Sequence, residues 1–229
     1  MTTIGTIWTY PNNPRVMKTQ AAANLNNLKL EYPAFEMRVT NQTPAFLSKF
    51  PLGKVPAFEA TDGTLLVESD AITQYVAESG PAAAQLLGTA AAERATIRQW
   101  ICYAEAEILG HLIPLILWRV GFKAYEEAVE KLALEKLGRS LGYLDKHLAG
   151  KTWVAGTEKL SLADISVASA LVWGFSMVVD AEMRRSYPNV IAWYERTIES
   201  DGVREALGPR TTSRRGRRAA TRLLTHDCL

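Results

Sequence analysis

A turn formed by Asp62 and Gly63 constrains the fold more than any other feature of this sequence. Two short apolar runs, residues 57–60 and 64–67, flank the turn. Asp-Gly tolerates the positive φ angles that tight β-turns need, so the two runs predict a β-hairpin. Ser69 follows directly and precedes a helical pattern of apolar residues, which makes it the expected N-cap of a helix. The segment therefore predicts two antiparallel strands that lead into a helix.

The N-terminal segment predicts a strand, a helix and a second strand. Residues 4–9 contain β-branched residues and end at a cluster of turn-forming residues. Pro14 is tolerated in a first helical turn, so a helix is expected to start there or at Arg15. A further strand is expected at residues 34–39. Together with the hairpin and its helix, residues 1–82 follow the order βαβ-ββα.

From about residue 90 the sequence predicts helices only. Apolar residues recur at spacings of three and four, which is the period of a helix with one buried face. Ser161 and Asp164 have the spacing of a capping box before an almost wholly apolar segment, which predicts a central buried helix. The helical segments are residues 91–121, 125–150, 161–179 and 188–200. The fold class is therefore α+β, with an all-α domain at residues 90–208.

The composition is that of a globular protein with one large domain or two small ones. The chain has 229 residues, and 48% of them are hydrophobic, enough for a sizeable core. The first residues lack the pattern of a secretion signal, and no run approaches the roughly 20 apolar residues that span a bilayer. We therefore expect a cytoplasmic protein without a membrane partner.

Charge is divided unevenly along the chain. Residues 209–229 carry six arginines and one aspartate, whereas the preceding residues carry 20 basic and 23 acidic groups. The basic tail has few core residues and is expected to be disordered. An acidic body does not favour a nucleic-acid surface, so no nucleic-acid partner is expected.

Cysteine and histidine give no sign of a metal site or of a disulfide framework. Cys102 lies in a helical pattern and Cys228 lies next to the C-terminus. Two cysteines cannot supply a four-ligand zinc site, and the three histidines lack the spacing of metal ligands. Cys102 is expected to pack as a small buried hydrophobe, and no metal is expected.

Three motifs together give the chain a family resemblance. The first is Gly-Lys-Val-Pro at residues 53–56. The second is residues 62–69, which begin with Asp-Gly and end with Glu-Ser. The third is Ser-Leu-Ala-Asp-Ile at residues 161–165. In this combination the sequence resembles the glutathione transferase superfamily over residues 1 to about 208. Within the superfamily it is most similar to the transferase-like domain of elongation factor 1B gamma. The resemblance implies a thioredoxin-like N-terminal domain that binds glutathione.

The resemblance assigns glutathione-binding roles to five residues. A cis peptide bond after Val55 would let its backbone pair with the cysteinyl part of glutathione. Glu68 would accept from the γ-glutamyl ammonium, while Ser69 and the helix N-terminus would hold the α-carboxylate. Lys54 would pair with the glycyl carboxylate. Asn41, a weaker donor to that carboxylate, stands where related sequences often have a histidine.

Three residues are candidates for the hydrogen-bond donor to the glutathione sulfur. Such a donor would stabilise the thiolate and lower the pKa of the thiol. The family places a Tyr, Ser or Cys at the end of the first strand or the start of the first helix. This region contains no Ser or Cys. The candidates are Tyr10, whose alternative role is core packing, and the amides of Asn12 and Asn13, whose alternative role is to form the turn. An amide donor is expected to make conjugation slow.

One helical stripe offers candidates for the site of the second substrate. Trp100, Tyr103, Glu107, His111 and Trp118 recur at helical spacing and share one face. One interpretation is that the aromatic residues pack in the core or at a dimer contact. The other is that Tyr103, Glu107 and His111 line the pocket for a small electrophile, where His111 could move protons.

Two functions from different classes follow from the resemblance. The first is a homodimeric glutathione-dependent transferase, with glutathione as co-substrate and no metal, in a biosynthetic or detoxifying pathway; isomerase, lyase or peroxidase variants are open. The alternative is a non-catalytic scaffold that binds a translation elongation factor subunit. The missing Ser favours the scaffold, and the complete set of residues from Lys54 to Ser69 favours the enzyme.

Overall fold

Residues 2–78 form a four-stranded sheet with helices packed against it. The computed structural model describes residues 1–208. The strand order is β2-β1-β3-β4, with β1 parallel to β2 and antiparallel to β3, which pairs antiparallel with β4. The elements are β1 (Thr2–Trp8), α1 (Pro14–Leu25), β2 (Leu28–Glu31), the 3-10 helix η1 (Thr40–Gln42), α2 (Pro44–Lys49), β3 (Ala57–Ala60), β4 (Leu65–Val67) and α3 (Ser69–Glu78). The predicted βαβ-ββα order and the thioredoxin-like fold are confirmed.

The sheet depends on a close backbone approach in β1. A Cβ atom added at Gly5 would lie 2.5 Å from the Glu59 carbonyl oxygen and 2.5 Å from the ring of Phe58. Only glycine therefore fits in β1 beside β3. Gly63 has a φ of 87°, so the turn between β3 and β4 has the conformation that its sequence predicts.

The second strand lies earlier in the chain than its predicted place, residues 34–39, and that prediction is wrong. β2 is Leu28–Glu31, where buried and exposed side chains alternate as they do in a half-buried strand. Pro33 follows closely and cannot donate to a strand ladder, so pairing does not extend beyond it. Residues 32–36 have no regular structure.

The start of α3 differs from the prediction by one residue. The N-cap is Glu68, whose φ is 66°, and Ser69 is the first residue of the helix. The prediction of Ser69 as the N-cap is therefore wrong. The Glu68 side chain is exposed, whereas Ser69 is buried.

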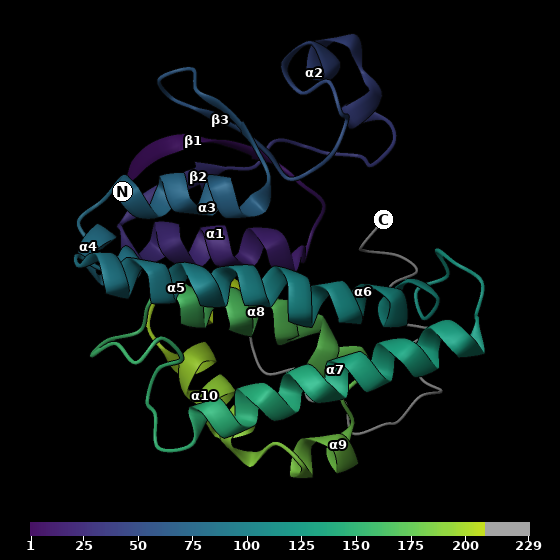
Figure 1. Cartoon of the computed structure of the whole chain (residues 1–229). Helices are drawn as coiled ribbons and strands as arrows, with labels where there is room; N and C mark the ends of the chain where they lie inside the picture. The colour runs from purple at the N-terminus through teal and green to yellow at the C-terminus, as the bar shows by residue number, and fades with distance from the viewer. Residues whose placement is uncertain (209–229) are drawn as a thin grey trace.

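The second half of the chain is wholly helical within the described residues, as predicted. Figure 1 shows α1 lying between α3 and α5, and α8 behind the long α5–α6 helix. The central helix α8 is buried over almost all its length and contacts both α1 and α5. The elements are α4 (Ala83–Leu87), α5 (Ala91–Tyr103), the π-helical turn η2 (Ala104–Leu109), α6 (Gly110–Leu117), α7 (Glu127–Leu148), α8 (Leu162–Met177), α9 (Ala181–Arg185), α10 (Pro188–Glu199) and α11 (Arg204–Leu207).

A capping box starts α8, as the sequence predicts. Asp164 accepts hydrogen bonds from the Ser161 backbone N–H (3.1 Å) and from the Ser161 hydroxyl (3.0 Å). Its other oxygen accepts from the Val154 N–H (2.7 Å) and from Trp193 Nε1 (2.8 Å). Asp164 is 0% exposed. It therefore joins the start of α8 to the preceding loop and to α10.

The helix from α5 to α6 is continuous through η2. This joined helix, Ala91–Leu117, is long and apolar enough to cross a membrane by length and composition alone, and a core helix of a globular protein meets the same criteria. Its buried side chains include Ile97, Trp100 and Ile101. Cys102 lies off this buried stripe and is exposed, so the prediction of a buried thiol is wrong. The predictions for Cys228 and for the basic tail concern residues outside the described part of the chain.

Candidate functional site

Three chain segments meet at one end of the sheet. Trp8, the last residue of β1, pairs with Ala57, the first residue of β3. Ala57 in turn pairs with Val67, the last residue of β4. The turn after β1, the loop before β3 and the bend after β4 therefore lie next to one another. These segments carry Tyr10, Lys54, Val55, Glu68 and Ser69, which the sequence proposed for one site.

Glu68 and Ser69 present polar groups at the N-terminus of α3. Among residues 1–208, neither the Glu68 carboxylate nor the Ser69 hydroxyl has a hydrogen-bond or ion-pair partner. Glu68 lines a hollow of about 1000 Å³ between α3 and α5. A positive φ in a non-glycine residue costs backbone energy, and such residues gather at functional sites. A carboxylate beside free helical N–H groups can receive an ammonium and a carboxylate from one ligand.

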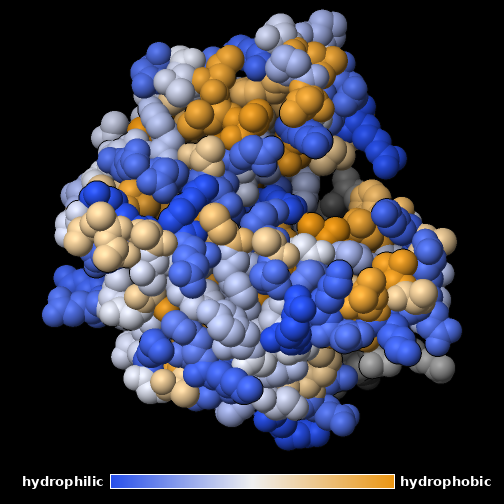
Figure 2. All heavy atoms as spheres, in the orientation of Figure 1, coloured by the Kyte–Doolittle hydropathy of each residue, from blue (hydrophilic) through white to orange (hydrophobic). Residues whose placement is uncertain are grey.

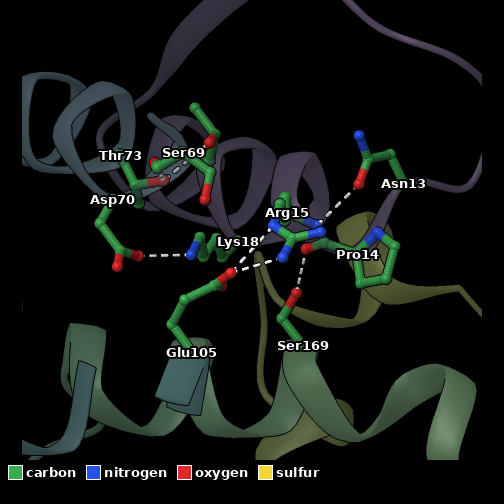
Figure 3. A network of polar contacts seen from close by, with 10 residues as sticks. Asn13, Pro14, Arg15, Lys18, Ser69, Asp70, Thr73, Glu105 and Ser169 are labelled. Atoms are coloured by element: carbon green, nitrogen blue, oxygen red, sulfur yellow. Dashed lines mark hydrogen bonds and ion pairs between the residues drawn. The ribbon is translucent and has the colours of Figure 1, made fainter. Parts of the chain in front are cut away.

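A network of polar contacts behind this helix start fixes its position (Figure 3). Lys18 of α1 is 4% exposed and forms an ion pair with Asp70 of α3. The hydroxyls of Thr19 and Thr73 lie 2.7 Å apart, and Thr73 also donates to the Ser69 carbonyl at 2.7 Å. Because these contacts hold α3 against α1, the Ser69 region is pre-organised for a ligand.

The loop before β3 contains the predicted cis peptide bond, between Val55 and Pro56. Lys54 is exposed, and Val55 is half-buried beside Trp8 and Phe46. Lys54 has no partner among the described residues, so its ammonium is available to an anion.

The Asn41 side chain links two loops by hydrogen bonds to their backbones. Its side-chain oxygen accepts from the Arg38 N–H at 2.6 Å, and its Nδ2 donates to the Gly53 carbonyl at 2.6 Å. Asn41 is 5% exposed. Its predicted contact with glutathione stays a prediction, and the geometry favours a role in holding the backbone next to Lys54.

The three candidate thiolate donors occupy different environments. Asn13 is 3% exposed and is the N-cap of α1: its oxygen accepts from the Arg15 N–H at 3.1 Å, and its Nδ2 donates to Thr9 Oγ1 at 3.1 Å. Asn12 is exposed and has a φ of 58°. Burial raises the pKa of the Tyr10 phenol, and the positive charge of Arg15 offsets part of that rise. Tyr10 and Asn12 are therefore better placed than Asn13 to meet a ligand.

Arg15 is a site residue that the sequence analysis did not single out. Its Nε donates to Glu105 Oε1 at 3.1 Å, and its Nη2 contacts the same oxygen at 2.5 Å (Figure 3). The side chains of Arg15 and Glu105 are 29% and 37% exposed. The position of Arg15 directly after the candidate donors was a usable signal. Its partner lies 90 residues away in the sequence and gave none.

The structure brings Tyr103, Glu107 and His111 together against α7. The Tyr103 hydroxyl donates to the Ser140 carbonyl at 2.7 Å, and the Ser140 hydroxyl donates to Glu107 Oε2 at 3.0 Å. His111 Nε2 lies 3.4 Å from Glu107 Oε2 without hydrogen-bond geometry. The Ser140 bond is the largest cause of a lowered pKa at Glu107. Trp100 packs edge-on against Tyr103 at 5.0 Å. This placement favours the packing interpretation, and a role in an acceptor pocket stays a prediction.

Residues 1–208 contain no group of three His, Cys, Asp or Glu side chains arranged to hold a metal ion. The polar groups at the end of the sheet are a carboxylate, an ammonium, hydroxyls and backbone groups, which suit an organic zwitterion.

Comparisons with known proteins agree with the fold. Family profiles described as the N-terminal and C-terminal domains of glutathione S-transferase match residues 4–78 and 98–201. Glutathione S-transferase-like protein FUS3 of Gibberella moniliformis is 51% identical over 208 residues, covering 91% of this chain and 94% of that protein. Elongation factor 1-gamma of Carassius auratus is 35% identical, covering 89% of this chain but 46% of that protein.

Solved structures give the same result. The theta class glutathione S-transferase of Xanthomonas axonopodis, with glutathione bound, has a TM-score of 0.79 at 25% identity and covers 91% of this chain and 99% of that chain. The GST-like domain of elongation factor 1-gamma from Saccharomyces cerevisiae has a TM-score of 0.77 at 22% identity, with 91% and 95% covered. The two profiles and the full-length relative show that this chain belongs to the glutathione S-transferase family.

Proposed function

We propose that this protein is a glutathione-dependent transferase that binds glutathione where the three segments meet at the end of the sheet. The meeting of those segments is the observation that carries the proposal. Glu68 accepts from the γ-glutamyl ammonium, and Ser69 with the N-terminus of α3 holds the α-carboxylate. The backbone of Val55 pairs with the cysteinyl unit, and Lys54 attracts the glycyl carboxylate.

In the proposed reaction the glutathione thiolate attacks an electrophilic carbon of a small second substrate. A carbon–sulfur bond forms, and either a leaving group departs with its electron pair or the adduct takes up a proton. The thiol proton goes to solvent when the thiolate forms. Tyr10 or Asn12 donates a hydrogen bond to sulfur, and the Arg15 charge adds electrostatic stabilisation.

The relatives favour the enzyme over the elongation-factor scaffold. The match to FUS3 covers 94% of that protein, whereas the match to elongation factor 1-gamma covers 46% of it. The name of FUS3 describes it as transferase-like. The free Glu68 carboxylate also favours a ligand site, because a scaffold would not need an unpaired acid at a strained position.

The proposal includes a homodimer in the cytoplasm. Leu65 and Val67 of β4 are 42% and 38% exposed, and Figure 2 shows apolar side chains gathered over the hairpin. This apolar surface is next to the hollow between α3 and α5, so one face combines apolar and charged groups. Val67→Glu is expected to shift the protein from dimer to monomer in analytical ultracentrifugation. Leu52→Glu, at another exposed site, serves as the control, and a dimeric Val67→Glu variant would contradict this interface.

Binding to immobilised glutathione tests the proposed function. The wild type and the control Glu78→Gln are expected to be retained and to elute with free glutathione. Glu68→Gln should be retained at least about tenfold more weakly, since it loses a charge-assisted contact of roughly 1.5–3 kcal/mol. Failure of the wild-type protein to bind would remove the transferase proposal and leave the scaffold.

A further inference from the structure

The hollow between α3 and α5 has walls of opposite charge. Glu68, Asp70 and Glu78 line it from α3, and Arg94 and Arg98 line it from α5. Apolar side chains, Ile97 and Ile101 among them, complete the lining. Opposed charges across one hollow suit a ligand that carries both charges at one end.

Most of these charged groups already have partners. Asp70 forms the ion pair with Lys18, and Glu78 accepts from Gln74 Nε2 at 2.6 Å. Arg94 Nη1 donates to the Thr89 carbonyl at 2.5 Å, which ties it to the loop before α5. Within residues 1–208, Glu68 and Arg98 have no ion-pair or hydrogen-bond partner. One free anion and one free cation therefore remain in the same hollow.

We infer that Arg98 joins Ser69 and the N-terminus of α3 in binding the α-carboxylate of the γ-glutamyl unit of glutathione, while Glu68 takes the α-ammonium. The inference rests on the proposed function and adds a residue from the helical half of the chain. An α-amino acid carries an ammonium and a carboxylate on one carbon, so a free anion and a free cation in one hollow match it. The guanidinium presents several N–H donors and suits a carboxylate better than an ammonium would.

This assignment makes Arg98 a determinant of specificity. Peptides with a free γ-glutamyl α-carboxylate should bind in preference to thiol peptides that lack it. The hollow is open and Arg98 is exposed, so solvent screens the contact between Arg98 and the carboxylate. We therefore expect the loss of Arg98 to lower the affinity for glutathione by about five- to tenfold. Arg94 has the same charge and lines the same hollow but is tied to Thr89, so it provides the matched control.

The experiment measures binding of two peptides to the full chain by isothermal titration. One peptide is glutathione, and the other is 4-aminobutyryl-cysteinyl-glycine, which lacks only the γ-glutamyl α-carboxylate. We expect Arg98→Ala to weaken glutathione about five- to tenfold and to leave the truncated peptide unchanged. Arg94→Ala should change neither affinity, and Arg98→Lys should restore part of the glutathione affinity.

Several outcomes would overturn the assignment. If Arg98→Ala weakens the binding of both peptides equally, Arg98 acts through the overall electrostatic potential of the protein or through its oligomeric state, and the specific contact is rejected. Light scattering on the same samples shows whether the oligomeric state has changed. If Arg98→Ala changes nothing while the wild type binds glutathione, the inference fails and the proposed function stands. A wild type that binds neither peptide would overturn both. Equal losses in Arg94→Ala and Arg98→Ala would also reject a specific role for Arg98.

Discussion

At the scale of single residues, Glu68 combines a strained backbone with an unpaired charge. Its φ of 66° lies where side chains other than glycine cost about 1–3 kcal/mol. Its neighbours do not use its carboxylate, so no contact of the Glu68 side chain within the described chain offsets that cost. The residue is therefore better explained by a ligand than by stability.

Replacement of Glu68 by glycine should separate stability from binding. We expect Glu68→Gly to raise the free energy of unfolding by about 1 kcal/mol, because relief of strain exceeds the entropy that glycine loses on folding. The same variant should lose retention on immobilised glutathione. Urea denaturation measures the first effect, with Glu68→Ala as the control that loses the carboxylate but keeps the strain. Equal stability of the two variants would show that the backbone at this position is not strained.

The Arg15–Glu105 pair should tune the bound thiol. Arg15→Ala removes a positive charge near Tyr10 and should raise the pKa of the glutathione thiol in the complex by about one unit. Glu105→Gln releases Arg15 from its counter-charge and should lower that pKa. Ultraviolet absorbance of the thiolate against pH measures both, with Arg185→Ala in α9 as the control. Shifts of the same sign in the two variants would contradict this electrostatic role.

Residue positions were predictable where they depend on a local motif. Lys54, Val55, Glu68 and Ser69 could be proposed from short sequence patterns, and the structure places them at one end of the sheet. The partners of Asn41 and Arg15 could not be predicted, since these contacts form only when distant segments pack. Their roles as a brace and as an ion pair follow from that packing.

At the scale of secondary-structure elements, strong local signals gave the right elements and weak ones did not. The capping box at Ser161 and the Asp62-Gly63 turn each satisfy backbone groups locally, so sequence alone predicts them. β2 is only four residues long and is defined by its pairing with β1, which no local pattern reveals. Cys102 was misjudged because a helical pattern does not show which flank of the apolar stripe a small residue occupies.

The fully buried cap of α8 should stabilise the fold more than the half-buried cap of α9. Asp164→Asn places an amide against the four donors that Asp164 now satisfies in a buried site. We expect a loss of about 3 kcal/mol in the free energy of unfolding, because buried donors lose their acceptors. Asp180→Asn, at the half-buried N-cap of α9, should cost less than about 1 kcal/mol. Thermal denaturation of both variants compares them, and similar losses would show that burial adds nothing to the cap.

At the scale of the whole molecule, α1 joins the two halves of the chain. It contacts α3 through the Lys18–Asp70 pair and α8 through the Ser169 hydroxyl, which donates to the Pro14 carbonyl. Asn24 Nδ2 donates to the Gly202 carbonyl at 2.8 Å. Helices from both halves therefore share one core, in line with the single large cluster of buried apolar residues that spans them.

Unfolding should be a single transition that glutathione shifts. Because α1 belongs to the one core that both parts of the chain share, we expect coincident unfolding curves from tryptophan fluorescence and circular dichroism. Glutathione at a concentration of 100 times its Kd should add about 2.7 kcal/mol to the stability of the wild type and much less to that of Glu68→Gln. Two separated transitions would show that the halves fold independently.

Because α1 packs against both parts of the chain, the N-terminal part should not be stable or functional as an isolated fragment. Cutting the chain after α3, at the end of the sheet layer, would bare the side of α1 that α8 and α11 now cover, and would remove Glu105 from Arg15. The resulting fragment would expose apolar surface, and the N-terminus of α1 would lose the contact that orients Arg15. The proposed glutathione site would therefore depend on helices that follow the sheet layer as well as on the sheet layer itself.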